Sequence, residues 1–311
     1  MFLSNFLTVL YQATALFIIM AIGYLLYRVK LVDDKSVTGM TNVLLWAVTP
    51  CLLVETFSRP FDLSLAVSLG IFALAAFLAK VASALISVLI FRRGVYDDRV
   101  ILRYSTIFSN CGFMGLPLAQ ALYGDEGVMY ASIFVAVFNL CQWTWGFAMM
   151  SGKGAPMKKL LLNPGIIGLV LGLPLFFFSI QLPDMIFYPI QSVASVNTPL
   201  AMIVIGCHLA QTDLREAIRQ PRVHIACLVR LIGLPLLFLA IFALLPIPLT
   251  PLALAVLVIE LSAPTAATTV LIGGMCGRNT ELGGQCVALS TLASVITLPL
   301  IATLAAKIFG V

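Results

Sequence analysis

Long apolar runs alternate with short polar segments along the whole chain. Ten of these runs contain about 20 or more residues, the length that a helix needs to cross a bilayer core. They cover roughly residues 6–27, 38–57, 63–91, 101–123, 128–150, 163–182, 186–210, 223–245, 251–274 and 282–309. The pattern predicts an all-α integral membrane protein with ten transmembrane helices.

Two of the predicted spans contain residues that break helices. The fourth span holds Asn110, two glycines and a proline within the segment 110–117, and the ninth holds Ser262-Ala263-Pro264-Thr265. Non-helical backbone at membrane depth is tolerated only where it is buried in protein or lines a wet cavity. Interruptions at corresponding places in two halves of a chain are typical of a transporter's binding site.

The composition supports the membrane assignment and narrows the function. Of the 311 residues, 61% are hydrophobic and only 10% are charged, and the mean hydropathy is +1.08. The net charge of +5 lies in short loops, so we expect no nucleic-acid partner. Seven cysteines form no CxxC pair, and we predict neither a cofactor nor a metal site. We expect no enzyme either, because the chain has no HExxH or GxSxG motif and its two histidines, His208 and His224, lie at the ends of predicted spans.

The loops on the two sides of the predicted membrane differ sharply in positive charge. Fourteen basic residues follow the odd-numbered spans: Arg28, Lys30, Lys35, Arg92, Arg93, Arg99, Arg103, Lys153, Lys158, Lys159, Arg215, Arg219, Arg222 and Arg278. The opposite side has only Arg59 and Lys307. Cytoplasmic loops carry the excess of Lys and Arg. We therefore expect a protein of the plasma or inner membrane with both termini on the extracytoplasmic side.

The chain has traces of an internal repeat. Lys80 and Arg230 are 150 residues apart, and Pro117 and Pro264 are 147 residues apart, each pair in corresponding spans. Thr49-Pro50 similarly recurs at Thr198-Pro199. Halves of five spans must lie inverted to each other in the membrane, so we predict inverted repeats over residues 1–150 and 151–311.

The two breaks predict a site for an anion. A proline suits the first turn of a helix, so Pro117 and Pro264 are expected to start second half-helices, with Ser262 as a cap. Such helix starts offer free amides and the positive end of a dipole to a carboxylate. The predicted substrate-binding residues at the breaks are Asn110, Gly112, Gly115, Pro117, Pro264 and Thr265.

Polar residues elsewhere in the spans add candidates. Lys80 and Glu260 are predicted to serve charge balance or proton coupling, with Lys80 paired to the anion, to Glu260 or to carbonyls freed by the breaks. The alternative for Lys80, and also for Arg230, is snorkelling, in which the charged head of a side chain reaches the water at the membrane surface. Asn139 and Gln142 share one helix face and are predicted to line the pocket or to contact neighbouring helices.

The motif Asn110-x-x-x-Met114-Gly115-x-Pro117-Leu118, followed by Tyr123-Gly124, resembles the fourth span of the auxin efflux carrier family. This family contains plant PIN carriers and bacterial malonate and malate permeases. Asn163-Pro164 is similar to the start of the family's second repeat, and Ala263-Pro264 is similar to its ninth span.

The resemblance implies two inverted five-helix repeats in which broken helices 4 and 9 cross. Spans 1, 2, 6 and 7 would form a scaffold and homodimer surface, and spans 3–5 and 8–10 a unit that moves as an elevator. Asn110 would bind the carboxylate of a small organic anion, Lys80 would match the family's charged position in span 3, and Asn139 would line the pocket.

Other functions stay open at this stage. A sodium-coupled organic-anion symporter of the bile-acid type is one, although it needs several oxygen ligands and only Glu260 is an acid close to a break. A ligand sensor or a channel is another. The residues do not identify the anion, the direction of net transport or the coupling ion.

The charge asymmetry gives a topology that labelling can test. A cysteine at position 158, in a protein without its native cysteines, is expected to react with a membrane-impermeant reagent only after the cells are permeabilised. Labelling at this position in intact cells would contradict both the orientation and the inverted repeat.

Overall fold

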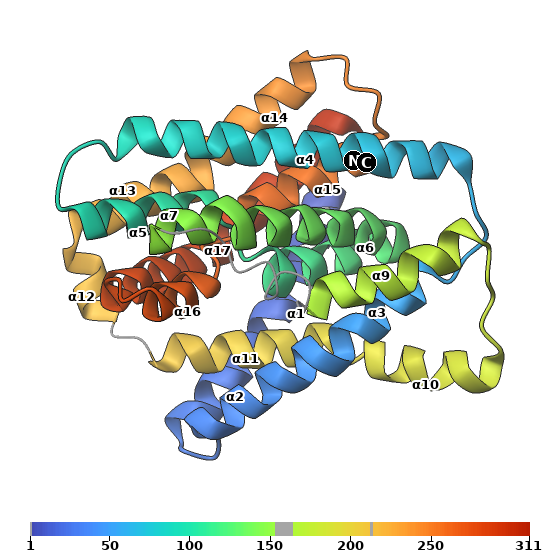
Figure 1. The fold of residues 1–311 in the computed structure, drawn as a ribbon, viewed down its shortest axis with the longest axis horizontal. Coiled ribbons are helices and arrows are strands. Elements are labelled where there is room, and N and C mark those ends of the chain that lie inside the picture. Colours follow the sequence, from blue (N-terminus) through green and yellow to red (C-terminus); the bar gives the residue numbers. More distant parts are fainter. Residues whose placement is uncertain (1, 153–163, 212–213) are drawn as a thin grey trace.

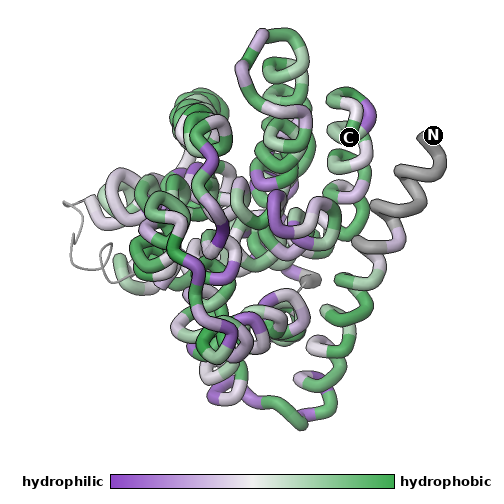
Figure 2. The backbone as a smooth tube through the Cα atoms, turned by 90° about the vertical axis from the view of Figure 1, so that its right-hand side faces the viewer, coloured by the Kyte–Doolittle hydropathy of each residue, from purple (hydrophilic) through white to green (hydrophobic). Residues whose placement is uncertain are grey.

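A computed structural model describes residues 2–152, 164–211 and 214–311 of the chain, and every named element in these ranges is a helix (Figure 1). The predicted basic loop residues Lys153, Lys158 and Lys159, and Asn163 at the start of the sixth span, lie outside the described residues. Figure 2 shows that hydrophobic residues dominate the helices, whereas hydrophilic residues gather in the connections.

The helices follow the predicted spans along the chain. The first half contains α1 (Phe2–Arg28), α2 (Asp34–Val43), η1 (Leu44–Val48), α3 (Thr49–Phe57), α4 (Leu63–Ile90), α5 (Tyr96–Ile107), η2 (Cys111–Gly115), α6 (Leu116–Cys141), η3 (Gln142–Gly146) and α7 (Phe147–Ser151). The second half contains α9 (Pro164–Phe177), α10 (Asp184–Ala194), α11 (Asn197–Gln211), α12 (Leu214–Arg219), α13 (Pro221–Leu228), η4 (Val229–Gly233), α14 (Leu234–Leu244), α15 (Pro251–Ser262), α16 (Thr268–Met275) and α17 (Thr280–Phe309).

Within the described ranges, six helical stretches are long and apolar enough to cross a membrane by length and composition. They are Asp34–Phe57, Leu63–Ile90, Cys111–Ser151, Asp184–Gln211, Pro221–Leu244 and Thr280–Phe309. Shorter apolar helices cover Thr14–Arg28, Pro164–Phe177 and Pro251–Ser262. Gly124 divides α6, because its φ of 58° and ψ of −145° are not helical. This turn falls between the fourth and fifth predicted spans.

Three of the π-helical turns, η1, η2 and η4, are each followed by a proline at the second residue of the next helix. These prolines are Pro50 in α3, Pro117 in α6 and Pro235 in α14. A proline ring clashes with the carbonyl four residues earlier in a regular α-helix. A turn with hydrogen bonds five residues apart removes that clash while the helix continues. These prolines therefore widen their helices locally without ending them.

This explains why the prediction for Pro117 is wrong. The second half-helix of the fourth span begins at Cys111, in η2, and Pro117 lies six residues further on. Pro264 does not start a helix either, because it lies in non-helical backbone before α16 begins at Thr268. Ser262 also does not cap the second half-helix, since its hydroxyl donates to the Val258 carbonyl inside α15.

Glycines allow two pairs of helices to approach each other closely. A Cβ at Gly206 of α11 would clash with the Met20 carbonyl of α1, and the Cys207 thiol donates to the Gly23 carbonyl at 3.2 Å. A Cβ at Gly172 of α9 would lie 2.9 Å from the Leu53 carbonyl oxygen of α3. Each pair joins the first span of one predicted half to the second span of the other.

We expect Gly206→Ala to lower the free energy of unfolding by about 1–3 kcal/mol, because the added methyl group has to separate two backbones in contact. Thermal unfolding of the purified protein in detergent measures the effect. Gly70→Ala is the matched control, since a Cβ at Gly70 of α4 meets no atom within 4 Å. Equal unfolding midpoints for the two variants would contradict the close contact.

Candidate functional site

The two interruptions predicted from the sequence lie against each other. Ser109, after the end of α5, and Thr265, after the end of α15, pair as an isolated antiparallel β-bridge. The Asn110 amide donates to the Pro264 carbonyl at 2.6 Å, and the Ala266 amide donates to the Phe108 carbonyl at 2.9 Å. These two bonds flank the bridged pair, as in an antiparallel ladder. The two non-helical segments thus satisfy part of each other's backbone.

Hydroxyl groups complete the bonding of this junction. The Thr265 amide donates to Ser290 Oγ at 3.0 Å, and Thr265 Oγ1 donates to the Ser105 carbonyl at 3.0 Å. Thr265 is 1% exposed. Its polar atoms are used to hold α5, α15 and α17 together. The structure therefore gives Thr265 a positioning role beside its predicted place among the substrate-binding residues.

Lys80 of α4 lies at the C-terminal end of α5. Its ammonium donates to the Ile107 carbonyl at 3.3 Å and to Ser109 Oγ at 3.1 Å. The same group lies 4.8 Å from the ring centroid of Phe134 and 5.4 Å from that of Phe138. Lys80 is fully buried and does not reach water, so the snorkelling alternative is wrong in this conformation. Of the three partners considered, the structure provides the carbonyls freed by the break.

Arg230 of η4 binds both helix ends at the junction. Its guanidinium donates to Thr106 O at 3.1 Å and to Ile107 O at 3.5 Å, at the end of α5. It also donates to Ala263 O at 3.0 Å and to Leu261 O, at the end of α15. Arg230 is fully buried, so snorkelling is also excluded for this residue. A planar group with five donors suits this role better than an ammonium does.

The charges at the junction have a consistent arrangement. Lys80 and Arg230 lie at the C-terminal ends of the first half-helices, where unbonded carbonyls and the negative end of the dipole favour cations. Their hydrogen bonds are directed to protein carbonyls and to the Ser109 hydroxyl rather than into a pocket. The helix N-termini at the junction carry a partial positive charge of their own.

Asn110 lies at the N-terminus of the helix formed by η2 and the first part of α6. Its carbonyl accepts from Met114 N at 3.0 Å and from Gly115 N at 3.3 Å. The amides of residues 111–113 precede the first of these bonds and have no acceptor among residues 2–152, 164–211 and 214–311, as is usual at the start of a helix. Asn110 is 7% exposed, and its side chain makes no hydrogen bond to the part of the chain that the structure describes. Its amide group can therefore bind a ligand.

The other predicted residues lie around this end in different ways. Gly112 has open space beside it, since a Cβ there would meet no atom within 4 Å, whereas Gly115 lies against the Glu260 carboxyl. Gln142 of η3 accepts from Thr268 Oγ1 at 2.6 Å and so links the fifth span to the start of α16. Asn139 is buried one turn before Gln142.

The sequence reasoning missed the serines and did not assign the cations' partners. Ser109 and Ser290 bind Lys80 and Thr265 at the junction. Serines in membrane helices often bond to carbonyls of their own helix, as Ser83 does here, so no sequence signal separates the two cases. The available sequence signal was that Lys80 and Arg230 are 150 residues apart, in corresponding spans of the two predicted repeats.

Replacing Arg230 by lysine is expected to lower the free energy of unfolding by about 2–4 kcal/mol, because one ammonium cannot reach both helix ends and buried carbonyls lose charged donors. Arg219→Lys, at an exposed position on α12, is the matched control. Thermal unfolding in detergent distinguishes them. An unfolding midpoint for Arg230→Lys equal to that of the control would show that the guanidinium bonds contribute little.

Comparisons with known proteins agree with this membrane architecture. The chain is 24% identical over 290 residues to an uncharacterized transporter of Methanothermobacter thermautotrophicus, covering 91% of this chain and 94% of the relative. It is 24% identical over 295 residues to an uncharacterized transporter of Methanocaldococcus jannaschii, with the same coverage. A sequence model of the family described as membrane transport protein matches residues 8–160 and 155–302. The chain therefore belongs to this family of membrane transporters, the auxin efflux carrier family.

Proposed function

We propose that the protein is a secondary-active carrier of small organic anions and binds a carboxylate at the N-terminus of η2. The observation that carries the proposal is the division of charge at the junction. Both buried cations bind carbonyls at the negative helix ends, while the Asn110 side chain and the first amides of η2 have no protein partner among the described residues. Helix N-termini with free amides bind anions without a charged side chain.

We further propose ten spans in two inverted repeats, with scaffold helices from spans 1, 2, 6 and 7. The close pairs α1–α11 and α3–α9 support this division, because backbones in contact leave little freedom to move within each pair. In each pair, the first span of one half contacts the second span of the other half, as a pseudo-two-fold axis in the membrane plane requires.

Ion pairs at one end of the molecule support a second body that moves as a unit. Arg278, between α16 and α17, pairs with Asp97 of α5, and Arg222 of α13 pairs with Asp98 of α5 at 3.1 Å. These residues come from the proposed cytoplasmic loops of spans 3–5 and 8–10. The pairs would hold these spans together during an elevator-type movement.

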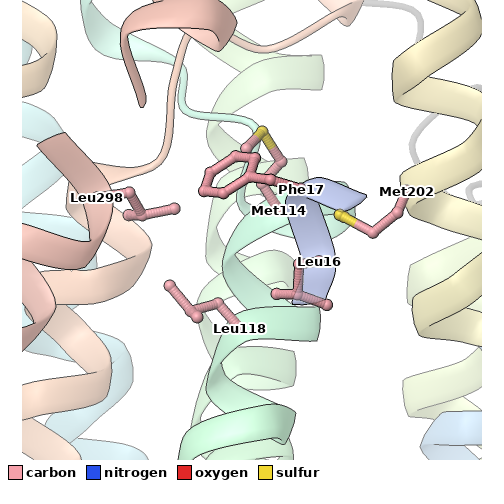
Figure 3. Close-up of a pocket in the computed structure, with 6 residues that line it drawn as sticks. All are labelled: Leu16, Phe17, Met114, Leu118, Met202 and Leu298. Atoms are coloured by element: carbon pink, nitrogen blue, oxygen red, sulfur yellow. The ribbon is translucent and has the colours of Figure 1, made fainter. Parts of the chain in front are cut away.

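The contact between the two bodies is largely apolar next to the junction. Figure 3 shows Leu16 and Phe17 of α1 and Met202 of α11 facing Met114 and Leu118 of the broken fourth span and Leu298 of α17 around a small pocket. Such a surface can slide with small loss of directional bonds, and methionines adapt to changed packing. The bond from Thr198 of α11 to Gln120 of α6, at 2.9 Å, would have to break during the movement.

Uptake into liposomes by the purified protein tests the proposed function. A panel of mono- and dicarboxylates is offered under imposed pH gradients and under sodium gradients. We expect saturable uptake or exchange of one or more of these anions. Conductance far above the turnover of a carrier would indicate a channel, and a requirement for sodium would favour the sodium-coupled symporter.

Asn110→Ala is expected to weaken anion binding roughly ten- to more than hundredfold, because the site loses a hydrogen bond to a charged group worth about 1.5–3 kcal/mol. Competition for the labelled anion in liposomes measures the change. Asn42→Ala, at an exposed position on α2, serves as the control. Unchanged affinity in a monodisperse Asn110→Ala protein would place the site elsewhere.

A further inference from the structure

Glu260 is a buried acid that takes no part in the hydrogen bonds of the junction. It lies on α15, four residues before Pro264, and its side chain is fully buried. Neither carboxyl oxygen has a hydrogen-bond partner among the described residues. An ionised carboxylate without donors is far more costly in such surroundings than a neutral acid. The conformation described here therefore suits the protonated form.

Gly115 provides the space for this carboxyl. A Cβ at Gly115 would overlap the Glu260 carboxyl, so a residue with a side chain would displace the acid. Gly115 is the last residue of η2, and its amide bonds to the Asn110 carbonyl. The acid of the ninth span thus touches the same helix turn whose N-terminus forms the proposed anion site.

The charged neighbours of Glu260 are already engaged. Lys80 and Arg230 both bind carbonyls at the junction, and Lys80 and Cys111 interact with Glu260 electrostatically. The titratable or charged groups on the other helices packed against α15 are Cys286, Glu281 and Lys307 of α17 and Tyr123, Asp125, Glu126, Tyr130 and Cys141 of α6, and α14 has none. Asp125, Glu126 and Glu281 are exposed, and Glu281 and Lys307 lie at the two ends of α17.

We propose that Glu260 is a proton-binding site that couples the carrier to pH. This inference rests on the proposed anion site. Gly115, which the carboxyl touches, follows Asn110 by five residues, a rise of roughly 7.5 Å at about 1.5 Å per residue. At that distance in protein, an ionised Glu260 repels a bound anion, whereas the neutral acid does not.

The coupling follows from this repulsion. Proton binding at Glu260 favours anion binding, and by linkage anion binding favours proton binding to the same extent. One proton is taken up by the carboxylate on the side where the anion binds and is released as the anion leaves on the other side. The two then cross together, and an acidic exterior drives accumulation of the anion inside.

The experiment compares the wild type, Glu260→Gln and Glu281→Gln in liposomes loaded at neutral pH. Glutamine keeps the shape of a neutral acid, so Glu260→Gln is expected to exchange labelled anion for unlabelled anion at equal pH. With an acidic exterior, the wild type and Glu281→Gln accumulate the anion several-fold above equilibrium, and Glu260→Gln does not. The affinity of the wild type falls tenfold per pH unit above the titration of the acid, whereas that of Glu260→Gln stays flat.

The experiment distinguishes failure of this inference from failure of the proposed function. Wild-type levels of pH-driven accumulation in Glu260→Gln would overturn this inference alone. Absence of any anion transport by the wild type would overturn the proposed function and this inference with it. Proton uptake by the wild-type protein on anion binding, followed with a pH dye in weakly buffered detergent, decides the matter if Glu260→Gln does not fold. No uptake between pH 5 and pH 9 would overturn the inference.

Discussion

The structure depends on one constraint, which is that every backbone polar group freed inside a membrane has to find a partner in the protein. Two helices are interrupted at the same place, and either break alone would expose amides and carbonyls at a cost of several kcal/mol each. The breaks are placed so that Ser109 and Thr265 pair with each other. The remaining carbonyls at the helix ends bind Lys80 and Arg230. Each break is therefore stable only in the presence of the other.

In this arrangement the charged side chains that stabilise the fold are not the groups that would bind a ligand. Two buried cations beside the proposed anion site first suggest direct ion pairing with the substrate. Their donors instead point at the negative ends of α5 and α15. An anion at the N-terminus of η2 would be bound by amides and by Asn110, which hold it without a permanent countercharge. Weak, neutral binding of this kind suits a carrier, which has to release its substrate on the other side.

Much of this could be predicted from the sequence, and the exceptions have physical reasons. The apolar runs located the helices, and the internal repeat put Lys80 and Arg230 in corresponding spans. The prolines were misleading, because a π-helical turn lets Pro117 continue a helix that a regular α-helix would end. The partners of the cations and the role of the serines depend on contacts between distant segments, which no local pattern reports. Of the glycines that pack helices together, Gly168 and Gly172 of α9 are four residues apart, a spacing that puts both on one helix face, while Gly23 and Gly206 stand alone in their helices.

The most direct test of the account is a structure of the protein with a transported anion bound. The account predicts density for the carboxylate within hydrogen-bond distance of the Asn110 side chain and the amides of residues 111–113, with Lys80 and Arg230 still bonded to the carbonyls of α5 and α15. An anion bound directly to the Lys80 ammonium or to the Arg230 guanidinium, in place of those carbonyls, would contradict it.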